Sequence, residues 1–200
     1  MIDERAIFCF DLGSPYAYLA AERISGLFAE AGLEQPEWRP VLLGGMFRAL
    51  GRSSWGLGPD RKDGMRDCEQ RASAYGLPPI RWPEPWPGDM LGAMRAATFA
   101  AQIGRITSFA LAAFRQSFAA GRDLSELDNL MLAGAASEIH PRALRTALER
   151  DAVKAELRAA TDDVVARGAV GVPSVIVGER VFWGDEQLEQ AVDATARERA

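Results

Sequence analysis

The chain has 200 residues, a formal net charge of −5 and 48% hydrophobic residues, which suits a single globular domain or one domain that carries an insertion. The basic residues are scattered among the acids and form no stripe, so we expect no binding to nucleic acid. No apolar run approaches the ~20 residues that cross a bilayer, and residues 1–5 lack the basic and apolar regions of a signal peptide. The expected location is therefore the cytoplasm, away from membranes.

The chain has few cysteine and histidine side chains, so a metal would need mostly carboxylate ligands, and the sequence shows no cluster of them. Its two cysteines, Cys9 and Cys68, form neither a C-x-x-C pair nor a metal-ligand cluster. Cys9 lies in an apolar run, where it is interpreted as a small buried hydrophobic residue. The single histidine, His140, precedes Pro141 at a predicted helix start and is interpreted as a surface cap rather than a base. We expect no metal site.

The opening residues predict a strand, a helix and a second strand. The apolar run at 6–11 (AIFCFD) indicates a buried strand. Apolar residues then recur at helical spacing from Pro15 onward, with Ser14 as N-cap and Pro15 at the first helical position, where its missing N–H costs nothing. Residues 37–43 (EWRPVLL) indicate the second strand, and Pro40 within it is typical of an edge or a bulge. Such a β-α-β unit implies that the two strands run parallel.

The middle of the chain, residues 44–167, is predicted to be helical and contains no convincing strand. Helices are expected at 44–52, 63–75, 89–103, 106–120, 125–138, 141–150 and 151–167, with a glycine-rich loop at 53–60 and an irregular segment rich in proline and tryptophan at 77–89.

The last segment returns to strands. Residues 174–177 (SVIV) and 180–183 (RVFW) predict a hairpin, and residues 185–196 predict a closing helix. This order is the thioredoxin arrangement, with the insertion where the disulfide-oxidoreductase branch of that fold has it. The expected fold class is therefore α/β, a thioredoxin-like fold with a large all-helical insertion. The thioredoxin-like domain would comprise residues 1–43 and 168–200, and the helical insertion residues 44–167.

In a thioredoxin fold, the reactive atom sits where the first strand meets the first helix. Backbone N–H groups and the helix dipole, equivalent to roughly half a positive charge, meet at that point and stabilise a thiolate. Ser14 and Ala17 occupy the two C-x-x-C positions in this sequence, which excludes thiol–disulfide exchange there. The hydroxyl of Ser14 could instead donate a hydrogen bond to a thiolate from outside the protein, or it could simply cap the helix.

A proline stands immediately before the strand at 174–177. In thioredoxin-fold proteins the equivalent proline is cis and abuts the active site, so Pro173 is predicted to be cis and to lie beside Ser14. The alternative is a trans proline at a strand edge, since only ~5–6% of X–Pro bonds are cis in folded proteins.

Three segments carry a family resemblance that covers essentially the whole chain. FDLGSPYAYLA, WRPVLLGGMFRALG and GAVGVPSVIVGERVFWGDEQLEQ resemble the opening, the second strand with its helix, and the ending of the 2-hydroxychromene-2-carboxylate isomerases and kappa-class glutathione transferases. The resemblance implies that glutathione is the thiol and that Ser14 stabilises its thiolate. It also implies that the backbone of Val172, beside Pro173, holds the cysteinyl unit.

Further glutathione contacts follow from the same resemblance. Asp185 and Glu186 fall where the family binds the γ-glutamyl end, although acids at a helix start also simply suit the helix dipole. Lys62 is the best match for a family lysine. Arg52 stands where the family often has Asn, and Gln187 replaces an Arg.

The resemblance also implies an acceptor pocket between the thioredoxin part and the helical insert. Its candidate walls are Phe47, Trp55, Trp82 and Trp86, the last two in the rigid run WPEPWP. The alternative is that these rings pack in the core beneath an irregular segment.

The sequence therefore predicts a glutathione-dependent isomerase that acts on a small aromatic substrate. A kappa-like transferase is the second hypothesis, and a redox-inactive thioredoxin-fold protein that binds peptides beside Pro173 is the third. The resemblance also implies a homodimer.

Overall fold

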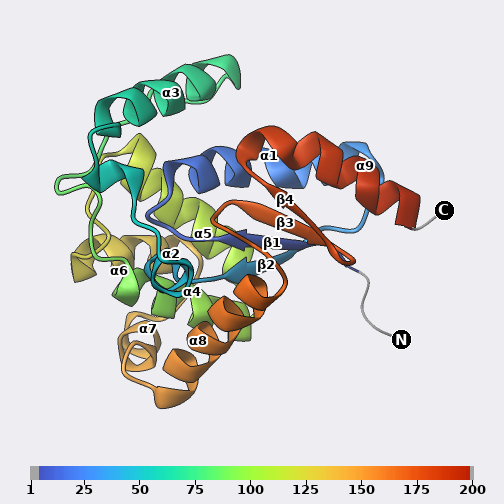
Figure 1. Ribbon diagram of the computed structural model, residues 1–200. Helices are drawn as coiled ribbons and strands as arrows, with labels where there is room; N and C mark the ends of the chain where they lie inside the picture. Colours follow the sequence, from blue (N-terminus) through green and yellow to red (C-terminus); the bar gives the residue numbers. More distant parts are fainter. Residues whose placement is uncertain (1–4, 199–200) are drawn as a thin grey trace.

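The computed structural model describes residues 5–198 and is drawn in Figure 1. The strands are β1 (Ile7–Phe10), β2 (Glu37–Pro40), β3 (Ser174–Val177) and β4 (Arg180–Trp183). The α-helices are α1 (Pro15–Glu30), α2 (Leu43–Leu50), α3 (Arg61–Ala74), α4 (Leu91–Gln102), α5 (Ile106–Phe114), α6 (Leu127–Ala136), α7 (Pro141–Ala147), α8 (Asp151–Ala166) and α9 (Leu188–Glu198). Two short 3₁₀ turns, η1 (Trp55–Leu57) and η3 (Asp185–Gln187), and a π-helical segment, η2 (Arg115–Ala119), complete the elements.

The four strands form one sheet in the order β2-β1-β3-β4. β1 runs parallel to β2, with Cys9 opposite Arg39, and antiparallel to β3, with Cys9 opposite Ser174. β3 and β4 form the predicted hairpin, and β2 lies at an edge, as Pro40 indicated. The β-α-β and β-β-α halves thus share one sheet, which confirms the predicted thioredoxin-like fold.

Alternate residues of the strands supply two hydrophobic cores, one on each face of the sheet. Phe8 and Phe10 pack with α1, α4, α5 and α9 in the larger core, while Ile7 and Cys9 pack with α2 and α8 in the smaller one. Figure 1 shows α1 and α9 on one side of the sheet and α8 on the other. The ring of Phe10 lies 5.8 Å from that of Phe114 in α5, so the larger core joins the sheet to the helical segment.

Residues 44–167 contain no strand, as predicted, although several element boundaries differ from the predicted ones by one to a few residues. The second strand ends at Pro40 rather than residue 43, because the N–H of Leu42 bonds to Thr161 and that of Leu43 to Asp11, and neither bonds to a strand. The helix expected at 106–120 changes to π-helix after Phe114. Within residues 5–198, no helix is both long and apolar enough to cross a membrane.

Two helical glycines should respond oppositely to alanine. A Cβ on Gly26, in α1, would meet nothing within 4 Å, whereas a Cβ on Gly64, in α3, would lie 2.4 Å from the ring of Trp55. Gly26→Ala should therefore raise the free energy of unfolding by ~0.8–1 kcal/mol through helix propensity. Gly64→Ala gains the same propensity but should be destabilising overall, because overpacking costs ~1–3 kcal/mol. Urea unfolding of the two variants checks this, and equal stabilisation by both would contradict the packing of Trp55 on α3.

Candidate functional site

Ser14 lies at the junction between β1 and α1, where the sequence placed it. Its N–H bonds to the carbonyl of Asp11 at 3.0 Å, which closes the turn after β1. Its Oγ accepts the N–H of Ala17 at 3.2 Å, so Ser14 is the N-cap of the helix, and Pro15 follows at the first position. The first turn of α1 contains no acidic side chain. The hydroxyl is therefore held at the positive end of a 16-residue helix.

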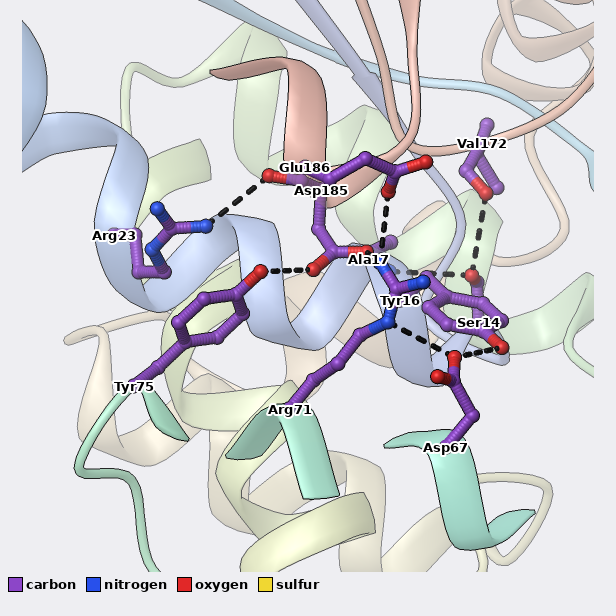
Figure 2. Close-up of polar contacts among 10 residues, drawn as sticks. All are labelled: Ser14, Tyr16, Ala17, Arg23, Asp67, Arg71, Tyr75, Val172, Asp185 and Glu186. Atoms are coloured by element: carbon purple, nitrogen blue, oxygen red, sulfur yellow. Dashed lines mark hydrogen bonds and ion pairs between the residues drawn. The ribbon is translucent and has the colours of Figure 1, made fainter. Parts of the chain in front are cut away.

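The second predicted element of the site reaches Ser14 from the far end of the chain. The Val172–Pro173 bond is cis, as predicted. Ser14 Oγ donates to the backbone oxygen of Val172 over 3.5 Å (Figure 2), a contact between residues 158 positions apart. The antiparallel pairing of β1 with β3 brings Ser14 and Val172 together, because the end of β1 and the start of β3 lie at the same edge of the sheet.

Ser14, Val172 and Pro173 open onto a cavity of about 960 Å³. Its walls come from Asp11 and residues 13–16, the exposed side of α2 with the following segment to residue 57, Arg71 of α3, residues 86–91, residues 170–173 and residues 183–186. Of the residues predicted for the site, the cavity brings together Ser14, Phe47, Arg52, Trp55, Trp86, Val172, Pro173, Asp185 and Glu186. Its volume is at the upper end of ligand pockets, ~300–1,000 Å³.

Two predicted site residues, Lys62 and Trp82, do not line this cavity. Lys62 is exposed on α3. Trp82 lies behind Trp86, with ring centroids 4.6 Å apart, and its indole N–H donates to Glu69 at 2.7 Å. It also packs on Phe118, so it supports the wall from the core side.

Trp86 forms the wall nearest the Ser14 turn. Its indole N–H donates to the carbonyl of Gly13 at 3.2 Å, and its ring packs on Trp55 at 4.9 Å between centroids. Trp55 in turn contacts the ring of Tyr16 in α1. Trp55 and Trp86 therefore line the cavity, and Trp86 is bonded to the backbone that precedes Ser14.

The two acids predicted for ligand binding, Asp185 and Glu186, are joined to α3 by Arg71. The buried carboxylate of Asp185 accepts from Arg71 Nη1 at 3.0 Å and from the hydroxyl of Tyr75 at 2.8 Å. Arg71 Nη1 also bonds to exposed Glu186 at 2.8 Å, and Nε bonds to Asp67 at 2.9 Å (Figure 2). Although partial burial opposes the charged form, these carboxylates raise the pKa of Arg71 overall. Arg71 and Tyr75 were missed from sequence, although their spacing from Asp67 places all three on one side of a helix.

Asp11 was also missed, and it is the buried acid closest in sequence to Ser14. Its side chain lines the cavity but is only 3% exposed. One carboxylate oxygen accepts the N–H of Gly13 at 2.8 Å and the other that of Leu43 at 2.7 Å. Burial raises the pKa of Asp11 from 3.8 to about 6, against these two hydrogen bonds, which favour the carboxylate. The only sequence signal was its place at the end of a strand, ahead of Gly13.

The remaining candidates for chemistry among the described residues are the two cysteines, any metal-binding cluster and His140. Cys9 and Cys68 are both free and buried, and burial raises the pKa of each thiol to about 12. Within residues 5–198, no group of three or more His, Cys, Asp or Glu side chains could hold a metal ion. The ring of His140 accepts the N–H of Arg142 at 3.2 Å and caps α7, as interpreted from sequence.

Comparison with known proteins places this geometry in a family. The model of the DSBA-like thioredoxin domain matches residues 6–196. The 2-hydroxychromene-2-carboxylate isomerase of Sphingobium xenophagum is 26% identical over 185 residues, which cover 91% of this chain and 93% of the relative.

Solved structures show the same fold. A structure of 2-hydroxychromene-2-carboxylate isomerase has a TM-score of 0.82 at 21% identity and covers 97% of this chain and 95% of its own. A probable DsbA oxidoreductase from Streptomyces coelicolor has a TM-score of 0.77 at 21% identity and covers 98% and 91%.

Neither cysteine should behave as a redox thiol. Because Cys9 and Cys68 are both 0% exposed and have raised thiol pKa values, the native protein should react far more slowly with a thiol reagent than the protein unfolded in urea. Absorbance at fixed pH near 7.5, with and without urea, measures both rates. Rapid labelling of one thiol in the native protein would contradict the burial of the strand or of α3.

Asp11 should leave a signature in the pH dependence of stability. A carboxyl whose folded pKa is raised takes up a proton on folding, so its stabilising contribution is full below about pH 4 and is lost as the pH rises to about 6. The shift from 3.8 to about 6 is roughly 2 units, or about 3 kcal/mol. The free energy of unfolding of the parent should therefore fall relative to that of Asp11→Asn between pH 4 and 6. Urea titrations at several pH values measure this, with Asp151→Asn as control, and parallel pH profiles of the parent and Asp11→Asn would contradict it.

Proposed function

The chain belongs to the family of DSBA-like thioredoxin domains, and from that premise we propose that it is a glutathione-dependent isomerase of the 2-hydroxychromene-2-carboxylate type. Its substrates would be conjugated aromatic compounds that arise in the degradation of aromatics. The observation that carries this proposal is the hydroxyl of Ser14, held at the N-terminus of α1 on the floor of a cavity of about 960 Å³. The similarity to the isomerase of Sphingobium xenophagum supports the same proposed function.

The residues at the two redox positions favour isomerisation over disulfide chemistry. Ser14 and Ala17 cannot form or resolve a disulfide, and the two cysteines are buried away from the cavity. A thiolate must therefore come with a ligand. The cavity has a polar floor at Ser14 and an aromatic wall at Trp55 and Trp86, which suits a thiol bound next to a flat apolar acceptor.

Bound glutathione would supply a thiolate that adds reversibly to a conjugated double bond and so allows rotation about it before the thiol is expelled. Ser14 contributes by electrostatic stabilisation and is not the nucleophile. Its hydroxyl proton now points to the carbonyl of Val172 at 3.5 Å, a long bond that a sulfur anion would replace. The same Oγ stays fixed by the N–H of Ala17, so the donor is oriented in advance.

The charged end of the cavity fits the γ-glutamyl group of such a thiol. Asp67, Asp185 and Glu186 occupy Nε and Nη1 of Arg71, and Nη2 has no partner among the described residues. Nη2 could therefore bind the α-carboxylate. Glu186 is exposed whereas Asp185 is buried, so Glu186 would bind the α-ammonium and Asp185 would hold Arg71 in place.

Arg52 also lines the cavity and is available for a second carboxylate. Its Nη1 donates to the carbonyl of Val170 at 2.7 Å, and its guanidinium lies 5.4 Å from the ring of Trp183. Both contacts hold the cation beside the Val172 backbone, where a thiol bound at Ser14 would pass.

Removal of the Ser14 hydroxyl should raise the pKa of bound glutathione. A hydrogen bond to a charged group is worth ~1.5–3 kcal/mol, and each pKa unit is about 1.36 kcal/mol, so Ser14→Ala should raise the thiol pKa by about one to two units. Thiolate absorbance against pH, with glutathione bound, measures the shift.

Ser14 is also the helix cap, so a matched variant must separate the two roles. Ala at an N-cap costs ~0.5–2 kcal/mol of stability, whereas Gly costs only a few tenths. Ser14→Gly and Ser14→Ala should therefore raise the thiol pKa alike while only Ser14→Ala loses stability in urea. A thiol pKa that changes in neither variant would leave Ser14 as a cap and remove the case for catalysis.

Turnover distinguishes the proposed isomerase from its two rivals. With 2-hydroxychromene-2-carboxylate and glutathione, an isomerase changes the ultraviolet spectrum of the substrate and leaves the glutathione concentration constant. A transferase consumes glutathione in proportion to product. If the protein binds no glutathione at millimolar concentration, and neither the spectrum of the substrate nor the glutathione concentration changes, both enzymatic functions are contradicted.

A further inference from the structure

Asp11 joins two parts of the cavity that are separate in sequence. One oxygen of its carboxylate accepts the N–H of Gly13, and its backbone carbonyl accepts the N–H of Ser14. Asp11 therefore shapes the turn that presents the hydroxyl of Ser14. Through the other oxygen it holds the N–H of Leu43, 32 positions away. The two side-chain bonds, 2.8 and 2.7 Å, are at the short end of the range for N–H···O contacts.

α2 depends on this carboxylate because it lacks a cap of its own. Leu42 is at the N-cap position and makes no side-chain bond to the helix. A carboxylate at a helix N-terminus satisfies an orphan N–H and interacts favourably with the dipole, and Asp11 supplies one from β1. The exposed side of α2 carries Phe47 and Arg48 into the cavity wall, so the position of that wall is tied to the Ser14 turn.

We propose that Asp11 is a positioning residue, whose carboxylate holds the Ser14 turn and the start of α2 in one arrangement and so sets the spacing between the thiolate site and the acceptor wall. Asp11 itself touches neither ligand in this role. The catalytic part of this inference rests on the proposed function, but the structural part does not.

The role requires the ionised carboxylate. A carboxylate accepts at both oxygens, whereas protonation turns one oxygen into a donor that faces an N–H. The charged side chains that line the cavity around Asp11 are Arg48, Arg52, Arg71, Asp89, Asp185 and Glu186. None of them bonds to Asp11, and its pKa of about 6 reflects burial against the two backbone bonds. The arrangement should therefore loosen as the pH falls through about 6.

The first test follows the two amides in the parent protein without any thiol. The ¹H–¹⁵N signals of Gly13 and Leu43 should titrate with one shared midpoint near pH 6, and the titration should vanish in Asp11→Asn. Asp151→Asn, which removes a fully exposed acid at the start of α8, should leave it unchanged. Amides that do not titrate, or that titrate with different midpoints, would overturn the inference.

A second variant removes the donor instead of the acceptor. Leu43 is the first residue of α2, where proline is tolerated, and Leu42 is extended, as a residue before proline must be. Leu43→Pro should keep the helix but delete one hydrogen bond to the carboxylate, so the Gly13 midpoint should move to higher pH. A folded Leu43→Pro protein whose Gly13 midpoint stays where the parent has it would contradict the shared carboxylate.

The third test concerns turnover. In Asp11→Asn, kcat for the chromene substrate should fall by about 10- to 100-fold, since small misplacements of reacting groups have effects of that size. The Kd for glutathione should change much less, and the acid limb of the parent's kcat profile near pH 6 should disappear. An unchanged kcat, or equal losses in kcat and glutathione affinity, would overturn the positioning role. If the parent itself has no turnover, the proposed function fails, while the amide titration still decides the part that Asp11 plays.

Discussion

The antiparallel pairing of β1 with β3 is the constraint on which the site depends. With Cys9 opposite Ser174, the end of β1 and the start of β3 lie at the same edge of the sheet. The chain that leaves β1 becomes the Ser14 turn, and the chain that enters β3 is the Val172–Pro173 segment. A shift of this register by one residue would turn every side chain of the strand to the other face. It would also separate the hydroxyl from the Val172 carbonyl, so fold and site are specified together.

The cavity contains two buried acids that are stabilised in different ways. Asp185 is bonded by charged and polar side chains, Arg71 and Tyr75, which link α3 to the turn before α9. Asp11 is bonded by backbone N–H groups alone. Burial raises the pKa of both carboxyls, against the bonds from Tyr75 and Arg71 at Asp185 and against the two backbone N–H bonds at Asp11. Both acids are therefore sensitive to pH, and the one at the carboxyl end of β1 adjoins the turn that carries Ser14.

The local features of the site could be predicted from sequence because short-range rules determine them. Ser14 followed by Pro15 is typical of a helix start, and the hairpin at 174–183 follows from two short runs rich in apolar residues joined by the tight turn at Gly178 and Glu179. The cis bond at Pro173 was predicted from resemblance and not from local sequence, and it is present.

The remaining features depend on distant partners. Arg71 lies 114 positions from Asp185 and Asp11 32 positions from Leu43, and no periodicity reports such pairs. Trp82 and Trp86 share one motif, yet only Trp86 lines the cavity, because its N–H reaches Gly13 while that of Trp82 reaches Glu69. Lys62 precedes Arg71 by nine residues on α3, which places the two about 180° apart around the helix. Sequence spacing could have indicated that Lys62 and the Arg71 cluster do not share a face.

The same fold serves relatives with different chemistry, so the function must be argued from the site. The helix N-terminus after β1 stabilises an anion whether the sulfur belongs to the protein or to a ligand. A thiolate that belongs to the protein needs little space at the helix N-terminus, because the molecule with which it exchanges disulfides can remain at the protein surface. A ligand thiolate would have to be accommodated together with the compound it attacks, and under the proposed function Ser14 leaves room for the sulfur of that ligand. Under the proposed function, Ser14, a cavity of about 960 Å³ and a tryptophan wall bonded to Gly13 would form one connected change, in which the reactive sulfur belongs to the co-substrate rather than to the chain.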